Sequence, residues 1–159
     1  RWKLVEKISF RIGLNKLTRI DEFNSWNDAI GYLVKLAEII FELRKMEQRN
    51  RNDEVVERIQ QFIAENLAGD LSLVRIAEYV NYNPSYVSRL FKQIKGMSLF
   101  DYINSARLKK AKELLEKSNE NIYSIAKTVG FDSSQYFATV FKKMTKMTPQ
   151  EYRDALINK

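Results

Sequence analysis

The chain has 159 residues, which is enough for one or two small domains. It contains no cysteine and no histidine, so disulfides, thiolate nucleophiles and imidazole bases or ligands are excluded. We therefore expect no enzyme activity, no metal site and no cofactor. The net charge of +7 favours a polyanionic partner. Neither an apolar run of membrane-spanning length nor a secretory signal occurs, so we expect no membrane contact and a cytoplasmic location.

The first part of the chain, residues 1–52, contains two predicted elements. Residues 4–14 alternate in part between apolar and polar side chains, which indicates a short N-terminal strand. The same residues equally suit the cut end of an upstream domain, because a lone strand has no ladder partner. Residues 26–50 predict a long helix that is apolar on more than one face. Such a helix either packs inside an upstream sensing region or forms a homodimer with its copy.

The second part, residues 53–159, is predicted to be helical throughout. A helix over residues 53–67 follows a polar hinge that we expect at residues 44–54. Asn83-Pro84 and Thr148-Pro149-Gln150-Glu151 are strong signals for the start of a helix. The later helices are expected at residues 72–80, 84–95, 98–117, 122–129 and 133–144, with a short last helix from Pro149.

Within this second part, one pattern occurs twice at an offset of about fifty residues. The matched apolar pairs are Val87 with Phe137, Leu90 with Val140, Phe91 with Phe141, and Ile94 with Met144. Each set has the spacing of one helical stripe. The chain therefore contains two helix-turn-helix units, residues 72–95 and 121–144. The predicted fold is all-α: two such units joined by a long linking helix, preceded by the long helix and the short strand.

The opposite faces of helices 84–95 and 133–144 carry small and polar side chains. These are Ser85, Ser88, Arg89 and Lys92 in the first helix, and Gln135, Ala138, Thr139 and Lys142 in the second. The major groove of double-stranded DNA admits one α-helix and presents base edges to such side chains. Two linked helices of this kind can enter successive major grooves about 34 Å apart. Double-stranded DNA is therefore the expected partner, and we expect the protein to be associated with the nucleoid.

Several short motifs carry a resemblance to a known family. They are Arg107 to Ala111, Leu114-Leu115, Ile125-Ala126, Val129-Gly130-Phe131, Tyr136-Phe137, Phe141-Lys142-Lys143 and Thr148-Pro149, with Ile76-Ala77, Ser88 to Lys92 and Tyr102-Ile103 in the first unit. Through them, about residues 53–157 resemble the AraC/XylS family of bacterial transcription regulators. The resemblance implies a DNA-binding module, a sensing or dimerising part upstream, an activator function and contact with RNA polymerase.

The resemblance also implies which side chains meet DNA. Base contacts are implied for Ser85, Ser88, Arg89, Ser134, Gln135, Ala138 and Thr139, and phosphate contacts for Lys92, Lys142 and Lys143. Arg89 is the strongest candidate, since a guanidinium can bind guanine bidentately. Other roles stay open: Arg89 and the lysines as solvated surface residues, and Gln135 as the partner of Asp132 in a capping box.

The chain departs from the family pattern at two places. Ala138-Thr139 stands where Ser-Arg is more usual, and Lys146 stands where Gly is common. A second class of function is a helical protein-interaction module that uses the same faces without reading bases. That function favours large apolar outer positions, whereas those of this chain are small or polar.

Overall fold

A computed structural model describes residues 6, 8–10 and 25–157 of the chain. These residues form helices and turns with no strand, which confirms the all-α prediction. The strand expected over residues 4–14 lies mainly outside the described residues, and the four described there are helical. The chain divides into two compact units, Arg1–Asn52 and Asp53–Lys159. The assignment of residues 1–52 to a sensing or dimerising region stays a prediction.

Helix α3 runs without a break from Trp26 to Glu65. The expectation of two helices separated by a polar hinge at residues 44–54 was therefore wrong. That stretch contains no glycine or proline to interrupt a helix. Its polar side chains bond to one another at helical spacing, as in the 2.9 Å hydrogen bond from Gln48 Nε2 to Asn52 Oδ1. A polar, charge-mixed sequence of this kind suits an exposed helix as well as a hinge.

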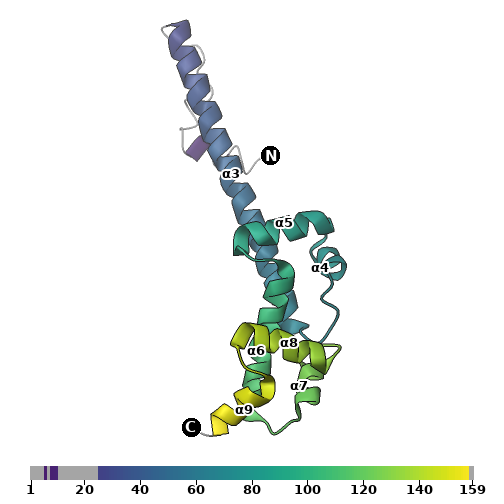
Figure 1. Ribbon diagram of the computed structural model, residues 1–159. Helices are drawn as coiled ribbons and strands as arrows, with labels where there is room; N and C mark the ends of the chain where they lie inside the picture. The colour runs from purple at the N-terminus through teal and green to yellow at the C-terminus, as the bar shows by residue number, and fades with distance from the viewer. Residues whose placement is uncertain (1–5, 7, 11–24, 158–159) are drawn as a thin grey trace. The chain divides into compact units, whose positions relative to one another are not determined.

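The helices predicted after residue 70 are all found. They are α4 (Leu73–Val80), α5 (Pro84–Lys95), α6 (Leu99–Lys117), α7 (Ile122–Thr128), α8 (Ser134–Thr145) and α9 (Pro149–Ile157), shown in Figure 1. Their ends differ from the predicted ends by no more than one residue where both ends were predicted. The two helix-turn-helix units are thus α4–α5 and α7–α8, and α6 is the linking helix.

Local capping explains why the helix starts were predictable. Asn83 Oδ1 accepts a hydrogen bond from the Ser85 amide at 2.9 Å, and Pro84 follows as the first helical residue of α5. At α9, the Glu151 amide donates to Thr148 Oγ1 while the Thr148 amide donates to the Glu151 carboxylate at 2.7 Å. This reciprocal pair is the predicted capping box. The hydrogen bond from the Thr148 amide to the carboxylate is the main reason that the pKa of Glu151 lies below its usual value.

Two hydrophobic clusters form the core of residues 53–157. The first joins the C-terminal part of α3 to α4, α5 and the start of α6, and the second joins the rest of α6 to α7 and α8. Leu99 and Ile103 belong to the first cluster, and Leu108 and Leu115 belong to the second. Helix α6 therefore anchors both helix-turn-helix units, each on its own segment of one rigid rod (Figure 1).

The apolar stripes of α5 and α8 point into these cores, with one exception. Val87, Leu90 and Phe91 of α5 are buried, as are the matching residues of α8. Met144, expected at the end of the second stripe, is instead 50% exposed. It lies in the last turn of α8, beyond the part of the helix that the second core covers.

Candidate nucleic-acid interface

The outer face of α5 is open to solvent along its length. Ser85, Ser88, Arg89 and Lys92 are all exposed, while the opposite stripe is buried. The N-terminal cap is satisfied by Asn83, so the two serine hydroxyls are not needed to terminate the helix. The face can therefore meet a polar partner without any rearrangement of the core.

Arg89 differs from the other arginines of residues 53–157. Arg58, Arg107 and Arg153 donate hydrogen bonds to backbone carbonyls, and Arg75 forms an ion pair with Glu78. No hydrogen bond or ion pair within the described chain engages the Arg89 guanidinium. Its five N–H donors are therefore available to an external acceptor.

The outer face of α8 is less polar and less open than that of α5. Gln135 and Thr139 are exposed, whereas Ser134 and Ala138 are half-buried. The helix is capped by Ser133, whose Oγ accepts from the Tyr136 amide at 3.4 Å. Ser133 rather than Asp132 is thus the N-cap, and no hydrogen bond among the described residues joins Gln135 to Asp132 as the alternative capping box requires.

Thr139 uses its hydroxyl inside the helix. Oγ1 donates to the Gln135 carbonyl oxygen at 3.0 Å. Threonine commonly bonds back to the preceding turn in this way. The side chain therefore offers an external partner its methyl group and the acceptor lone pairs of its oxygen, but not the hydroxyl proton.

The three candidate phosphate-binding lysines are exposed in the last turns of the two helices. Lys92 lies near the end of α5, and Lys142 and Lys143 lie near the end of α8. Cations at a helix C-terminus also interact favourably with the helix dipole. Their position therefore suits a phosphate contact and a structural role equally, and their assignment to phosphates stays a prediction.

Both units contain residues in the left-handed conformation, in the turn between their two helices and at the end of the second helix. Asn81 (φ 61°) and Gly130 (φ 93°) form the turns before α5 and α8, the two recognition-type helices. Gly96 (φ 71°) ends α5, and Lys146 (φ 68°) ends α8. The Lys146 amide donates to the Lys142 carbonyl at 2.8 Å, just as Gly96 donates to that of Lys92. The predicted departure at Lys146 is therefore accommodated by the same cap geometry, with backbone strain that glycine avoids.

Arg107 has a role that its local sequence does not indicate. From α6, its Nε donates to the Leu67 carbonyl at 3.0 Å, and its guanidinium lies 5.7 Å from the centre of the Phe131 ring. It thus connects the segment after α3 with the turn of the second unit. Partial burial lowers its pKa, which the nearby Asp132 partly offsets. No local pattern could have indicated this role, because Leu67 lies 40 residues away in sequence.

Gly130 allows the Leu67 carbonyl and the Arg107 guanidinium to lie close to the turn of the second unit. A Cβ atom at that position would lie 2.1 Å from the Leu67 carbonyl oxygen. The positive φ of Gly130 is unfavourable for other residues as well. The turn of the second unit therefore needs glycine for both space and backbone conformation, whereas the first unit uses Asn81 there.

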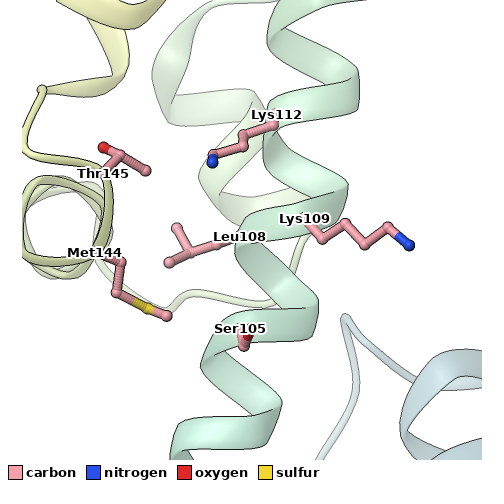
Figure 2. Close-up of a pocket in the computed structure, with 6 residues that line it drawn as sticks. All are labelled: Ser105, Leu108, Lys109, Lys112, Met144 and Thr145. Atoms are coloured by element: carbon pink, nitrogen blue, oxygen red, sulfur yellow. The ribbon is translucent and has the colours of Figure 1, made fainter.

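A small pocket of about 200 Å³ lies between α6 and the end of α8 (Figure 2). It is lined by Ser105, Leu108, Lys109, Lys112, Met144 and Thr145. In Figure 2 the Lys109 amine points away from α8, and the exposed Met144 lies on the opposite wall. The Lys112 amine lies 5.6 Å from the centre of the Tyr152 ring. The pocket has no cluster of convergent polar groups that would indicate a ligand site.

The described part of the chain contains no group of acidic residues arranged to hold a metal ion. Among the same residues, no helix has the length and apolar character needed to cross a membrane.

Two capped helix-turn-helix units on one linking helix define the class of protein. Residues 76–155 match the family model described as a helix-turn-helix domain. The chain belongs to the AraC/XylS family of transcription regulators, as its sequence motifs indicated.

Individual relatives agree with this membership. The chain is 35% identical over 105 residues to the regulatory protein PocR of Salmonella typhimurium, covering 66% of this chain and 35% of PocR. It is also 35% identical over 117 residues to the arabinose operon regulatory protein of Escherichia coli, covering 70% and 40% of the two chains. The chain thus matches well under half the length of these curated relatives.

Among solved structures, the fold is similar to the C-terminal domain of AraT, a response regulator from Geobacillus stearothermophilus. The TM-score is 0.62 at 38% identity, covering 64% of this chain and 84% of that one. The similarity therefore concerns the double helix-turn-helix part.

Proposed function

We propose that this chain is a sequence-specific, double-stranded DNA-binding transcription regulator that inserts α5 and α8 into successive major grooves. The observation that carries this proposal is the pair of helices with buried apolar stripes and open polar outer faces, held by one linking helix. Family membership and the net charge of +7 support the same function. The base-reading residues are those of the sequence analysis, with Arg89 first among them.

Gel-shift titration against a random duplex pool, at low and at moderate salt, tests this function. A regulator of this kind enriches a defined duplex that it binds about a thousandfold or more tightly than random duplex. A non-specific basic protein also binds at low salt, but enriches nothing. If the chain binds no duplex at either salt concentration, the result favours the second candidate class, a protein-interaction module.

The protein-interaction alternative predicts large apolar anchors on the outer faces. In α5 and α8 those positions carry serine, glutamine, alanine, threonine, lysine and one arginine. This composition favours the DNA-binding function.

Activation of transcription and contact with RNA polymerase are the finer parts of the proposal. They rest on the family, whose curated members include regulators named for the operons they control, such as the arabinose operon protein. A cytoplasmic, nucleoid-associated location follows from the proposed DNA partner. Transcription from a selected operator in vitro, with and without the chain, separates activation from repression.

Homodimerisation through residues 26–50 is a separate part of the proposal. In this part of α3, large apolar side chains face solvent, as shown by Leu33 at 57% and Phe41 at 75% exposure. Exposed apolar surface of this kind favours association. Sedimentation of the whole chain and of residues 53–159 tests the idea: a dimer is expected only for the whole chain. Identical monomers in both samples contradict it.

A further inference from the structure

We propose that the two helix-turn-helix units read different base chemistry: a guanine under α5, and A·T pairs with an exposed thymine methyl group under α8. The proposal rests on the DNA-binding function proposed above and specifies the operator that this chain selects. It follows from the side chains that each outer face has free for contact.

Helix α5 presents an exposed guanidinium group. Arg89 is exposed, and no partner within the described chain holds its guanidinium. A guanidinium binds the O6 and N7 acceptors of guanine bidentately, and this is the commonest specific contact in the major groove. The flanking Ser85 and Ser88 are exposed, and their hydroxyls can accept or donate a hydrogen bond with any base. Guanine is therefore the base that this face selects most strongly.

Helix α8 offers methyl groups at the corresponding positions. Ala138 has only a methyl group, and the Thr139 hydroxyl proton is engaged with the Gln135 carbonyl at 3.0 Å. The thymine C5 methyl is the apolar group of the major groove, and alanine and threonine methyls are suitable partners for it. Cytosine, which lacks this methyl, leaves the same contact unmade.

The remaining side chains of α8 agree with an A·T preference. Gln135 is exposed, and an amide binds N6 and N7 of adenine bidentately. Ser134 adds a hydroxyl that can form a hydrogen bond with either an A·T or a G·C pair. From Ser134 to Phe141, α8 contains no lysine or arginine, so no cation there competes for guanine. The first cations of the helix, Lys142 and Lys143, lie in its last turn.

The experiment starts from a duplex selected from a random pool by the whole chain. We expect two conserved segments about one helical turn apart, one containing guanine and the other rich in A·T pairs. Replacement of the conserved guanine by 7-deazaguanine removes one of the two acceptors and should weaken binding about tenfold. This loss should be absent for Arg89→Ala, which assigns that segment to α5.

Replacement of thymine by uracil in the other segment removes only the methyl group and keeps the base pair. We expect binding to weaken about fourfold, which is the effect of burying one methyl group. Two matched variants identify the protein partner. Thr139→Ser keeps the hydroxyl that bonds to Gln135 but lacks the methyl; combined with Ala138→Gly, which removes the second methyl group, it should bind thymine and uracil duplexes equally. Thr139→Val keeps the methyl and should retain the fourfold difference.

The outcomes separate this inference from the function on which it rests. If no duplex is enriched, the DNA-reading function itself fails. If duplexes are enriched but both segments require guanine, or uracil binds as tightly as thymine, only the assignment of A·T chemistry to α8 is overturned. The same holds if the thymine preference persists when Thr139→Ser is combined with Ala138→Gly, because this double variant lacks both methyl groups. Circular dichroism of each variant checks that the helices are retained.

Discussion

At the residue scale, exposure alone does not distinguish a DNA contact from an ordinary surface side chain. The candidates on α5 and α8 are mostly exposed, but so are Lys109 and Lys110 of the linking helix. The more informative property is whether a side chain already has a partner. Arg89 has none within the described chain, whereas Lys110 pairs with Glu113 at 3.3 Å. An unpaired guanidinium on a helix face opposite a buried stripe is the better candidate for base recognition.

We predict that Arg89→Ala loses about 1–3 kcal/mol of binding free energy on the selected duplex and relaxes specificity at one base pair. The reason is the loss of a bidentate guanine contact. Arg75→Ala is the charge-matched control, because Arg75 is exposed on α4 and paired with Glu78 at 3.5 Å. Competition binding against duplexes mutated at each position measures both effects. An equal loss on every duplex contradicts base reading by Arg89.

Lys142→Ala is predicted to act differently, because a phosphate contact carries no sequence information. Binding should weaken on all duplexes together, and the slope of log affinity against log salt should become shallower by about 1. Lys110→Ala removes one charge from α6 and should leave that slope nearly unchanged. Titrations at four salt concentrations measure the slopes; an unchanged slope for Lys142→Ala removes it from the interface.

At the element scale, the two units have the same helix-cap geometry but use different residues for it. Both recognition-type helices end in the left-handed conformation, at Gly96 in the first and Lys146 in the second. Glycine adopts this conformation without the steric cost that a Cβ atom brings. The second unit therefore retains strain at a position where the first unit has none.

Lys146→Gly should raise the free energy of unfolding by about 1 kcal/mol, since it relieves this strain. The matched control is Gly96→Ala, which should lower it by a similar amount. A Cβ atom at Gly96 meets nothing within 4 Å, so the control tests backbone conformation alone. Urea denaturation measures both, and a Lys146→Gly variant of unchanged midpoint would show that the cap is unstrained.

At the scale of residues 53–157, the arrangement of the two units depends on contacts distant in sequence. Each unit has its own core on α6, and Arg107 joins the segment after α3 to the Gly130-Phe131 turn. A rigid link between two reading helices is what allows them to select a fixed spacing between grooves.

Arg107→Met is predicted to lower the free energy of unfolding by about 1–3 kcal/mol, because the Leu67 carbonyl loses its charged donor. The spacing preference should also relax: duplexes with one base pair added between the two segments should compete better than against the wild type. Lys110→Met, on the exposed side of the same helix, is the control. Arg107 has no positioning role if both variants keep the wild-type stability and spacing preference.

Much of the helical structure was predictable because its causes are local. Capping residues such as Asn83 and Thr148 act within one turn, and buried stripes repeat at helical spacing. The duplicated pattern was sufficient to predict two units and their outer faces. The hinge expected at residues 44–54 was wrong because polar residues are compatible with both a helix and a loop when no glycine or proline decides.

The sequence by itself therefore determined the helix starts after residue 70, the duplication, the family and the side chains presented on each outer face. Tertiary structure decided which of those side chains are free. It placed Met144 outside the core and joined Arg107 to a carbonyl 40 residues away. These properties depend on how separate segments pack and on the rotamers that side chains adopt there, and neither is encoded in a local pattern.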